Sequence, residues 1–181
     1  MIIFGITGTL GAGKGTVVEY LKQKGFTHYS VREFLIEEIK RRGLPVNRDS
    51  MNMIGEGLRA EHGASYIVGI LYDRAAQAGA DAIIDSIRTV GEVEMLKQKG
   101  GKLIAIDASP DVRYRRVVAR GSETDAVSFE KFIADEERES QGDDPARMNI
   151  RAVATLADYS FMNEATIEEL YTKLDTVLAL S

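Results

Sequence analysis

Apolar residues fall into two patterns that alternate along the whole chain. Short apolar runs rich in branched side chains are typical of buried strands, and apolar residues recurring every three or four positions are typical of amphipathic helices. This alternation predicts an α/β fold, with a parallel sheet of about five strands, helices on both faces, and ligands at the carboxyl ends of the strands. Strands are predicted at Ile2–Thr7, Phe26–Tyr29, Ala82–Asp85, Lys102–Asp107 and Tyr159–Met162. Helices are predicted to begin near Lys14, Ser30, Arg48, Ser65, Thr89, Pro110, Ser128 and Thr166.

The segment of residues 44–79 interrupts this alternation, because two helical patterns follow one another with no strand between them. The chain has 181 residues and no long linker of low complexity, so we expect a single domain. Its core is predicted at residues 1–43 and 80–181, and the helical insert lies after the second strand. The insert is either a flap over a second substrate or an additional packing element.

Residues 8–16 read Gly-Thr-Leu-Gly-Ala-Gly-Lys-Gly-Thr, between the first predicted strand and the first predicted helix. This context and the Gly-x4-Gly-Lys spacing are typical of a P-loop. The glycines let backbone N–H groups turn toward a phosphate, and the helix N-terminus adds partial positive charge. The motif predicts the three-layer P-loop NTPase fold and an ATP site. Its expected members are Gly8, Gly11, Ala12, Gly13, Lys14, Gly15 and Thr16.

Two oxygen-bearing side chains are candidates for holding Mg²⁺ beside the phosphates. The residue after Lys14 is Gly15, so the hydroxyl of the motif comes one place late, at Thr16. Asp85 ends a buried strand, where a carboxylate can hold Mg²⁺ or its waters; the alternative is a turn or a helix cap. Arg88 follows three residues later, close enough to share the site.

Phosphoryl transfer depends mainly on positioning and positive charge, so convergent arginines are the next signal. Arg113, Arg116 and Arg120 share one face of a predicted helix. This face either meets an anion or is a solvated basic face opposite acids such as Glu136. Glu33 fits a capping box with Ser30, and His28 and His62 show no partner pattern.

Composition narrows the classes of protein that remain. The net charge of −5 argues against a nucleic-acid binder with a broad basic face, and no apolar run approaches the length of a membrane span. There is no cysteine, which excludes disulfides and thiol chemistry and fits a cytoplasmic protein. We therefore expect small-molecule nucleotides as partners, with no nucleic acid and no membrane. The oligomeric state is left open between monomer and dimer.

These segments together resemble the P-loop nucleoside monophosphate kinases, adenylate kinase-like in the P-loop. The chain is most similar to the predicted AMP/CMP-kinase-like P-loop nucleotide kinases. The resemblance implies transfer of the γ-phosphoryl group of MgATP to a nucleoside or deoxynucleoside monophosphate, and a short lid at about residues 120–127. The segments that carry it are Gly8–Thr16, Ser30–Leu35, Asp85–Arg88, Asp107–Arg120 and Ala157–Leu170.

The resemblance also implies roles for individual residues. Asn163 would lie where such kinases pass backbone around the adenine of ATP. The family has an arginine where this chain has Ile36, and Arg32, one turn earlier on the same face, is a candidate replacement. The implied catalytic residues are Lys14, Arg88, Arg116 and Arg120. The implied acceptor-binding residues are Arg32, Glu33, Arg48, Arg59 and Arg88.

Two other functions stay open at this point. Dephospho-CoA kinases are similar at the beginning and end of the chain, but they activate a hydroxyl and use an acidic pair after the second strand. Residues 29–32, Tyr-Ser-Val-Arg, take that place here. The second alternative is an ATP-binding switch or assembly factor with slow ATPase activity, because its P-loop would look the same.

Overall fold

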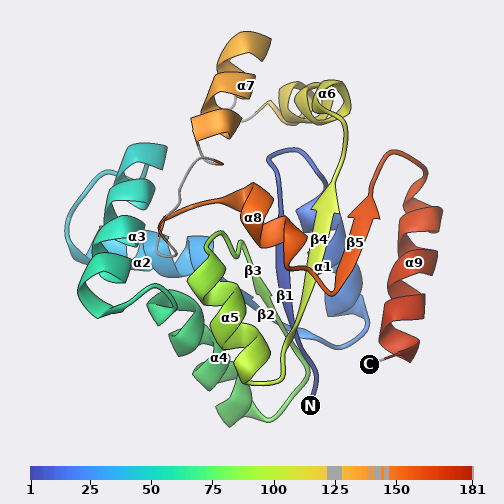
Figure 1. Ribbon diagram of the computed structural model, residues 1–181, viewed down its shortest axis with the longest axis horizontal. Helices are drawn as coiled ribbons and strands as arrows, with labels where there is room; N and C mark the ends of the chain where they lie inside the picture. Colours follow the sequence, from blue (N-terminus) through green and yellow to red (C-terminus); the bar gives the residue numbers. More distant parts are fainter. Residues whose placement is uncertain (122–127, 139, 141–143, 145–146, 181) are drawn as a thin grey trace.

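A five-stranded parallel sheet in the order β2–β3–β1–β4–β5 forms the centre of the molecule (Figure 1). The computed structural model describes residues 1–121, 128–138, 140, 144 and 147–180. The observed sheet, with helices on both faces, confirms the predicted fold class. The strands are β1 Ile3–Gly8, β2 Thr27–Ser30, β3 Ala82–Asp85, β4 Lys102–Asp107 and β5 Tyr159–Met162.

The helices begin within one residue of each predicted start, because most starts carry a local cap. Ser30 and Thr89, for example, accept hydrogen bonds from backbone N–H groups three residues later. The helices are α1 Lys14–Gln23, α2 Val31–Arg41, α3 Arg48–His62, α4 Tyr66–Ala78, α5 Val90–Gln98, α6 Pro110–Arg120, α7 Phe129–Arg138, α8 Ile150–Thr155 and α9 Ile167–Ala179. None of these helices combines the length and the apolar character that a membrane span requires.

Strands β1 and β2 each begin and end one residue later than predicted, and one helix was not predicted. The second strand begins one residue later, because the Phe26 N–H closes the end of α1 on the Leu21 carbonyl and pairing starts at Thr27. The first strand runs on to Gly8, which pairs with β4. Helix α8 was not predicted; it has six residues, too few to show a helical period, and is capped by Asn149.

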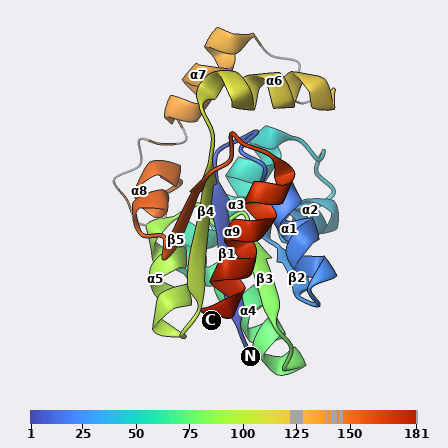
Figure 2. The ribbon, with the colours of Figure 1, turned by 90° about the vertical axis from the view of Figure 1, so that its right-hand side faces the viewer.

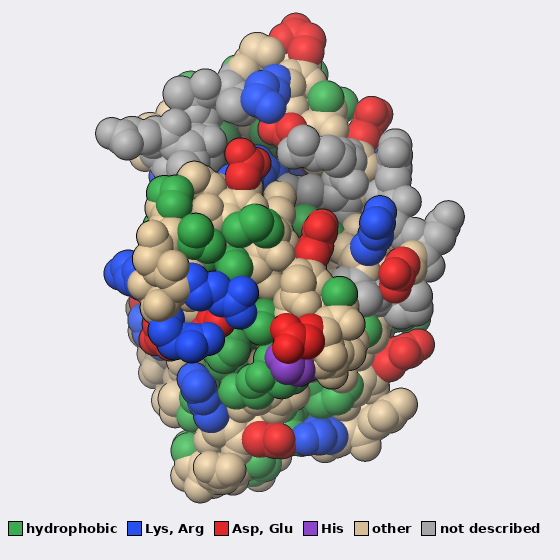
Figure 3. All heavy atoms as spheres, turned by 90° about the vertical axis from the view of Figure 1, so that its left-hand side faces the viewer, with side chains coloured by type: hydrophobic (Ala, Val, Ile, Leu, Met, Phe, Trp, Pro, Cys, Tyr) green, Lys and Arg blue, Asp and Glu red, His purple; other side chains and the backbone are tan. Residues whose placement is uncertain are grey.

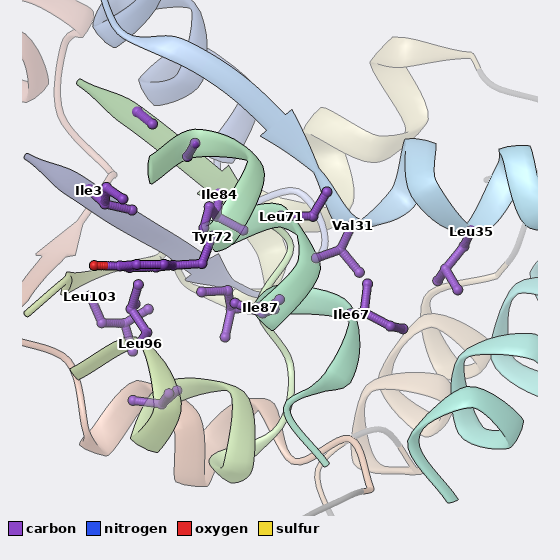
Figure 4. Close-up of a cluster of buried hydrophobic side chains, with 14 of the residues drawn as sticks. Ile3, Val31, Leu35, Ile67, Leu71, Tyr72, Ile84, Ile87, Leu96 and Leu103 are labelled. Carbon is purple, nitrogen blue, oxygen red and sulfur yellow. The ribbon is translucent and has the colours of Figure 1, made fainter. Parts of the chain in front are cut away.

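Each face of the sheet has its own apolar core, because side chains alternate along a strand. Phe4 and Ile6 of β1 pack against α1 and α9, and Figure 2 shows α9 lying across that face. Ile3 points the other way, into the core that α2, α3, α4 and α5 cover (Figure 4). On this second side Gly5 leaves room for its neighbours, because a Cβ there would lie 2.5 Å from methyl groups of Ile87 and Leu96, which would have to shift.

Helices α3 and α4 follow one another with no strand between them, and both are anchored by the second core. Leu35 of α2 and Ile67 of α4 belong to this core (Figure 4), together with the buried Ile54 and Leu58 of α3. Burying an aliphatic side chain of this size contributes about 1.5–3 kcal/mol. The packing holds α2 and α3 beside the carboxyl ends of β1 and β3.

Candidate functional site

A cavity of about 740 Å³ opens at the carboxyl ends of β1 and β3. Its floor is the loop between β1 and α1, and its walls come from α2, α3, α6, α8 and the loop after β3. This is where a doubly wound sheet binds its ligands. A single cavity therefore brings together elements that are far apart in the sequence.

Glycine is required at several positions where β1 leads through this loop to α1, and Gly11, with φ +82°, is one of them. Gly8 has φ +147°, and a Cβ there would lie 2.1 Å from the Ile106 carbonyl oxygen. Gly13 has φ +101°, and its Cβ would lie 2.2 Å from the Asn163 side-chain nitrogen. That nitrogen donates to the Ala12 carbonyl at 2.8 Å. The loop is thus held from behind, and its open side faces the cavity.

Lys14 is the cation nearest to this loop in the sequence. Its Nζ donates to the Gly8 carbonyl at 2.6 Å and to the Thr9 carbonyl at 2.9 Å. These contacts fold the side chain across the open side of the loop, where a phosphate would offer stronger, charged acceptors. Thr16, in the first turn of α1, lines the same cavity.

Cationic side chains dominate the cavity wall, although the chain as a whole carries a net charge of −5. Among the lining residues that the structure describes, only Asp85 and Glu56 are acidic. Acids outside the lining pair with Arg48 and Arg59, and an anion that enters the cavity would still meet a largely cationic wall. The cations are Lys14, Arg32, Arg48, Arg59, Arg88, Arg116 and Arg120.

The arginines of α6 divide into two kinds. Arg113 is buried, donates to the Ala108 carbonyl and is paired with Glu136 of α7, so it joins the two helices. Arg116 donates from Nη2 to the Asn163 carbonyl at 2.8 Å. Its Nη1 is buried and has no hydrogen-bond partner among the described residues. A buried donor without a partner is unfavourable, which points to a ligand atom at this position.

Glu92 organises a second part of the wall from a fully buried position. Its Oε1 accepts from Nε and Nη2 of Arg59, at 3.0 and 2.8 Å. Its Oε2 accepts from the backbone N–H groups of Arg88 and Thr89, at 3.0 and 3.2 Å. One carboxylate therefore fixes the Arg59 side chain and the backbone that carries Arg88. Glu92 was not among the predicted site residues, although Thr89 and Glu92 have the spacing of a capping box.

Asp85 has a partner that sequence reasoning missed. His28 was expected to have none, yet its Nε2 lies 3.4 Å from Oδ2 of Asp85, because β2 and β3 are neighbours. Interaction with this carboxylate raises the pKa of His28 above its usual value, against the opposing effect of partial burial. The other oxygen of Asp85, Oδ1, is buried with no hydrogen-bond partner among the described residues.

The remaining predicted residues take different places. Arg32 and Arg48 line the cavity, and Arg48 also approaches Asp135 of α7 at 3.8 Å. Glu33 does not line it, because it lies on the exposed side of the first turn of α2. Asn163 and the side chain of Ala12 do not line it either, since both lie behind the loop. Residues 122–127 of the predicted lid lie outside the described residues.

Comparison with known proteins identifies the family. The model of a family described as an AAA domain, AAA_18, matches residues 5–141. A UPF0200 protein of Pyrobaculum aerophilum is 32% identical over 179 residues, which cover 97% of this chain and 96% of that protein. This chain belongs to the AAA_18 and UPF0200 families. Membership of a P-loop domain family implies nucleotide binding.

Solved structures agree with the fold. The crystal structure of TT1252 from Thermus thermophilus is 25% identical, with a TM-score of 0.59 over 98% of this chain and 96% of that chain. Shikimate kinase from Bacteroides thetaiotaomicron is 17% identical, with a TM-score of 0.54 over 98% of both chains. The UPF0200 chain thus has the architecture of small P-loop kinases.

Proposed function

We propose that this UPF0200 protein is an ATP-dependent phosphotransferase that moves the γ-phosphoryl group of MgATP to a nucleoside or deoxynucleoside monophosphate. The observation that carries the proposal is the convergence of the P-loop with Lys14 and six arginines on one cavity. Two phosphate-bearing ligands are anions that suit this largely cationic wall. The likeness to the fold of small-molecule kinases supports it further.

The chemistry needs little from the protein beyond position and charge. An oxygen of the acceptor phosphate forms a bond to the γ-phosphorus, and the bond from that phosphorus to the bridging oxygen breaks, which leaves ADP. Because the second pKa of a phosphate monoester is about 6, the acceptor is mostly a dianion at neutral pH. No general base is therefore required.

The residues divide between the two ligands in this proposal. The P-loop and Lys14 bind the triphosphate, and the backbone around Asn163 passes near the adenine. Arg116 supplies its buried Nη1 to the transferring group, with Arg120 beside it. Residues 1–43 and 80–181 act as the core, and residues 44–79 as the acceptor-binding insert. The acceptor phosphate lies among Arg32, Arg48, Arg59 and Arg88.

The residues present fit a hydrated Mg²⁺ ion. Mg²⁺ usually keeps several waters and takes only one or two carboxylates besides substrate phosphates. Asp85 offers a buried oxygen without a partner among the described residues, and Thr16 lines the same cavity. The described residues contain no group of three or more potential ligands from His, Cys, Asp and Glu. When bound, the ion would neutralise charge on the β- and γ-phosphates.

An assay of ADP formation tests this proposal. ATP turnover is measured with AMP, CMP, UMP, GMP, their deoxy forms and dephospho-CoA added singly. We expect at least one monophosphate to accelerate turnover strongly. Acceleration by dephospho-CoA alone would favour a hydroxyl acceptor, and slow turnover that ignores every addition would favour an ATPase switch; either result contradicts the proposal.

Lys14→Ala is expected to abolish transfer and to weaken binding of a nonhydrolysable MgATP analogue by at least about tenfold, because a charged phosphate contact is lost. The matched control is Lys22→Ala on the same helix, since Lys22 is exposed and pairs only with Glu19 among the described residues. Circular dichroism checks that both variants fold. Activity in Lys14→Ala equal to that of the control would refute the phosphate role.

A further inference from the structure

Helix α3 presents a row of four polar side chains to the cavity. Arg48, Asn52, Glu56 and Arg59 all line it, and their spacing of four, four and three residues places them on one face of the helix. Glu61, also on α3, does not line the cavity. A ligand held against this face therefore meets a cation, an amide, a carboxylate and a second cation in turn.

Glu56 is the member of this row that phosphate binding does not explain. Within the described part of the chain its exposed carboxylate makes no hydrogen bond or ion pair, although seven cations line the same cavity. Arg59, one turn away, is instead paired with the buried Glu92. The Asn52 amide likewise has no partner among the described residues.

The chemistry of a carboxylate limits what Glu56 can face. An ionised carboxylate only accepts hydrogen bonds, and it repels a phosphate placed beside it. Asn52 can donate or accept. The two residues lie one helical turn apart, about 6 Å along the axis, a distance comparable to the hydrogen-bonding edge of a heterocyclic base. This pair therefore suits the organic part of the acceptor, at a position where that part carries donors.

We propose that Glu56, supported by Asn52, determines base specificity by accepting a hydrogen bond from an exocyclic amino group of the acceptor. This inference rests on the proposed function. A base with an amino group is favoured over its counterpart with a carbonyl at the same ring position. In the counterpart two acceptors face each other, and both lose their hydrogen bonds to water without replacement.

The test uses nucleotide pairs that differ in this one group, CMP against UMP and AMP against IMP. Values of kcat/KM are measured for the wild type, Glu56→Gln and the control Glu61→Gln. We expect the wild type to favour the amino member of at least one pair by on the order of tenfold or more. In Glu56→Gln this ratio should fall toward one, because an amide can also donate, while the KM for ATP stays unchanged. Glu61→Gln should match the wild type.

Calorimetry measures the binding of the same nucleotides with a nonhydrolysable MgATP analogue present. It tests the role of Glu56 separately from the proposed phosphoryl transfer. If no monophosphate accelerates ATP turnover, the proposed function fails, and the binding ratios still decide the role of Glu56. If the wild type binds the amino member of a pair more tightly and Glu56→Gln loses this preference, the inference is supported in either case. Equal ratios in the wild type and Glu56→Gln overturn it, because Glu56 is then only a solvated surface residue.

Discussion

At the scale of single residues, the role of each arginine depends on which acid can reach it. Arg113 and Arg116 lie one turn apart on α6, but only Arg113 meets Glu136. Arg116 keeps a buried Nη1 without a partner among the described residues. The sequence could place both on one face, but it could not show which of them an acid from α7 neutralises.

On the side of the cavity that we assign to the acceptor, Glu92 is the acid that determines the role of an arginine, Arg59. It is fully buried and joins α3 to the loop that carries Arg88. Removing one partner of a buried ion pair is strongly destabilising, typically by about 3–5 kcal/mol, because the other charge stays buried without compensation.

We therefore expect Glu92→Gln to lower the free energy of unfolding by about 3 kcal/mol or more. The glutamine oxygen can still accept from the Arg88 backbone, but the charge opposite Arg59 is lost. Because Arg59 is then less firmly positioned, the KM for the monophosphate should rise while the KM for ATP changes little. Urea unfolding and steady-state kinetics measure the two effects.

The double variant Arg59→Met with Glu92→Gln separates stability from function. It removes the uncompensated guanidinium, so much of the lost stability should return, while acceptor binding should stay weak. If both KM values rise together in Glu92→Gln, or if the double variant recovers the wild-type KM for the monophosphate, then Glu92 is only structural and this account of the wall is wrong.

At the scale of elements, the starts of helices were predictable because their signals are local. The ends of strands were less predictable. The Ser30 cap lies within four residues of sequence. The start of β2 instead depends on how Phe26 closes the preceding helix. Asp158 gives another example, since it joins three elements just before β5. It accepts from the Leu103 N–H of β4 at 2.7 Å and pairs with Lys97 of α5 at 2.9 Å.

The pKa of Asp158 predicts how these contacts respond to pH. Partial burial alone would raise it, but the Leu103 N–H and Lys97 outweigh that effect and lower the pKa below 3.8. A carboxyl whose pKa is lowered by folding adds stability above its unfolded pKa and loses this contribution as pH falls through the folded pKa. Asp158→Asn should therefore cost about 1–2 kcal/mol near neutral pH and progressively less below about pH 4.

Urea unfolding between pH 7 and pH 2.5 measures this difference. Asp73→Asn is the control, because Asp73 forms an exposed pair with Lys99, which contributes at most about 1 kcal/mol. If the difference in the free energy of unfolding between the wild type and Asp158→Asn grows as the pH falls, folding does not lower the pKa of Asp158.

At the scale of the whole molecule, the sequence located one half of the site better than the other. The P-loop and the strand ends were predictable, because a local motif and the parallel order of strands determine them. The convergence of Arg32, Arg48 and Arg59 on the cavity depends on how α2, α3 and α4 pack, which periodicity alone does not determine. The net charge of the chain also did not indicate the charge of the cavity lining. Figure 3 shows cations and anions interspersed over one outer face, whereas the lining of the cavity is mainly cationic.

The destination of the γ-phosphoryl group distinguishes a phosphotransferase from an ATPase. Phosphorus NMR of the wild-type protein with MgATP and the most effective monophosphate from the ADP assay follows it over time. We expect resonances of the acceptor's diphosphate, formed at the expense of the monophosphate resonance as ATP is consumed, and none of them with Lys14→Ala. Accumulation of inorganic phosphate in their place, with the monophosphate unchanged, would contradict the proposed phosphoryl transfer.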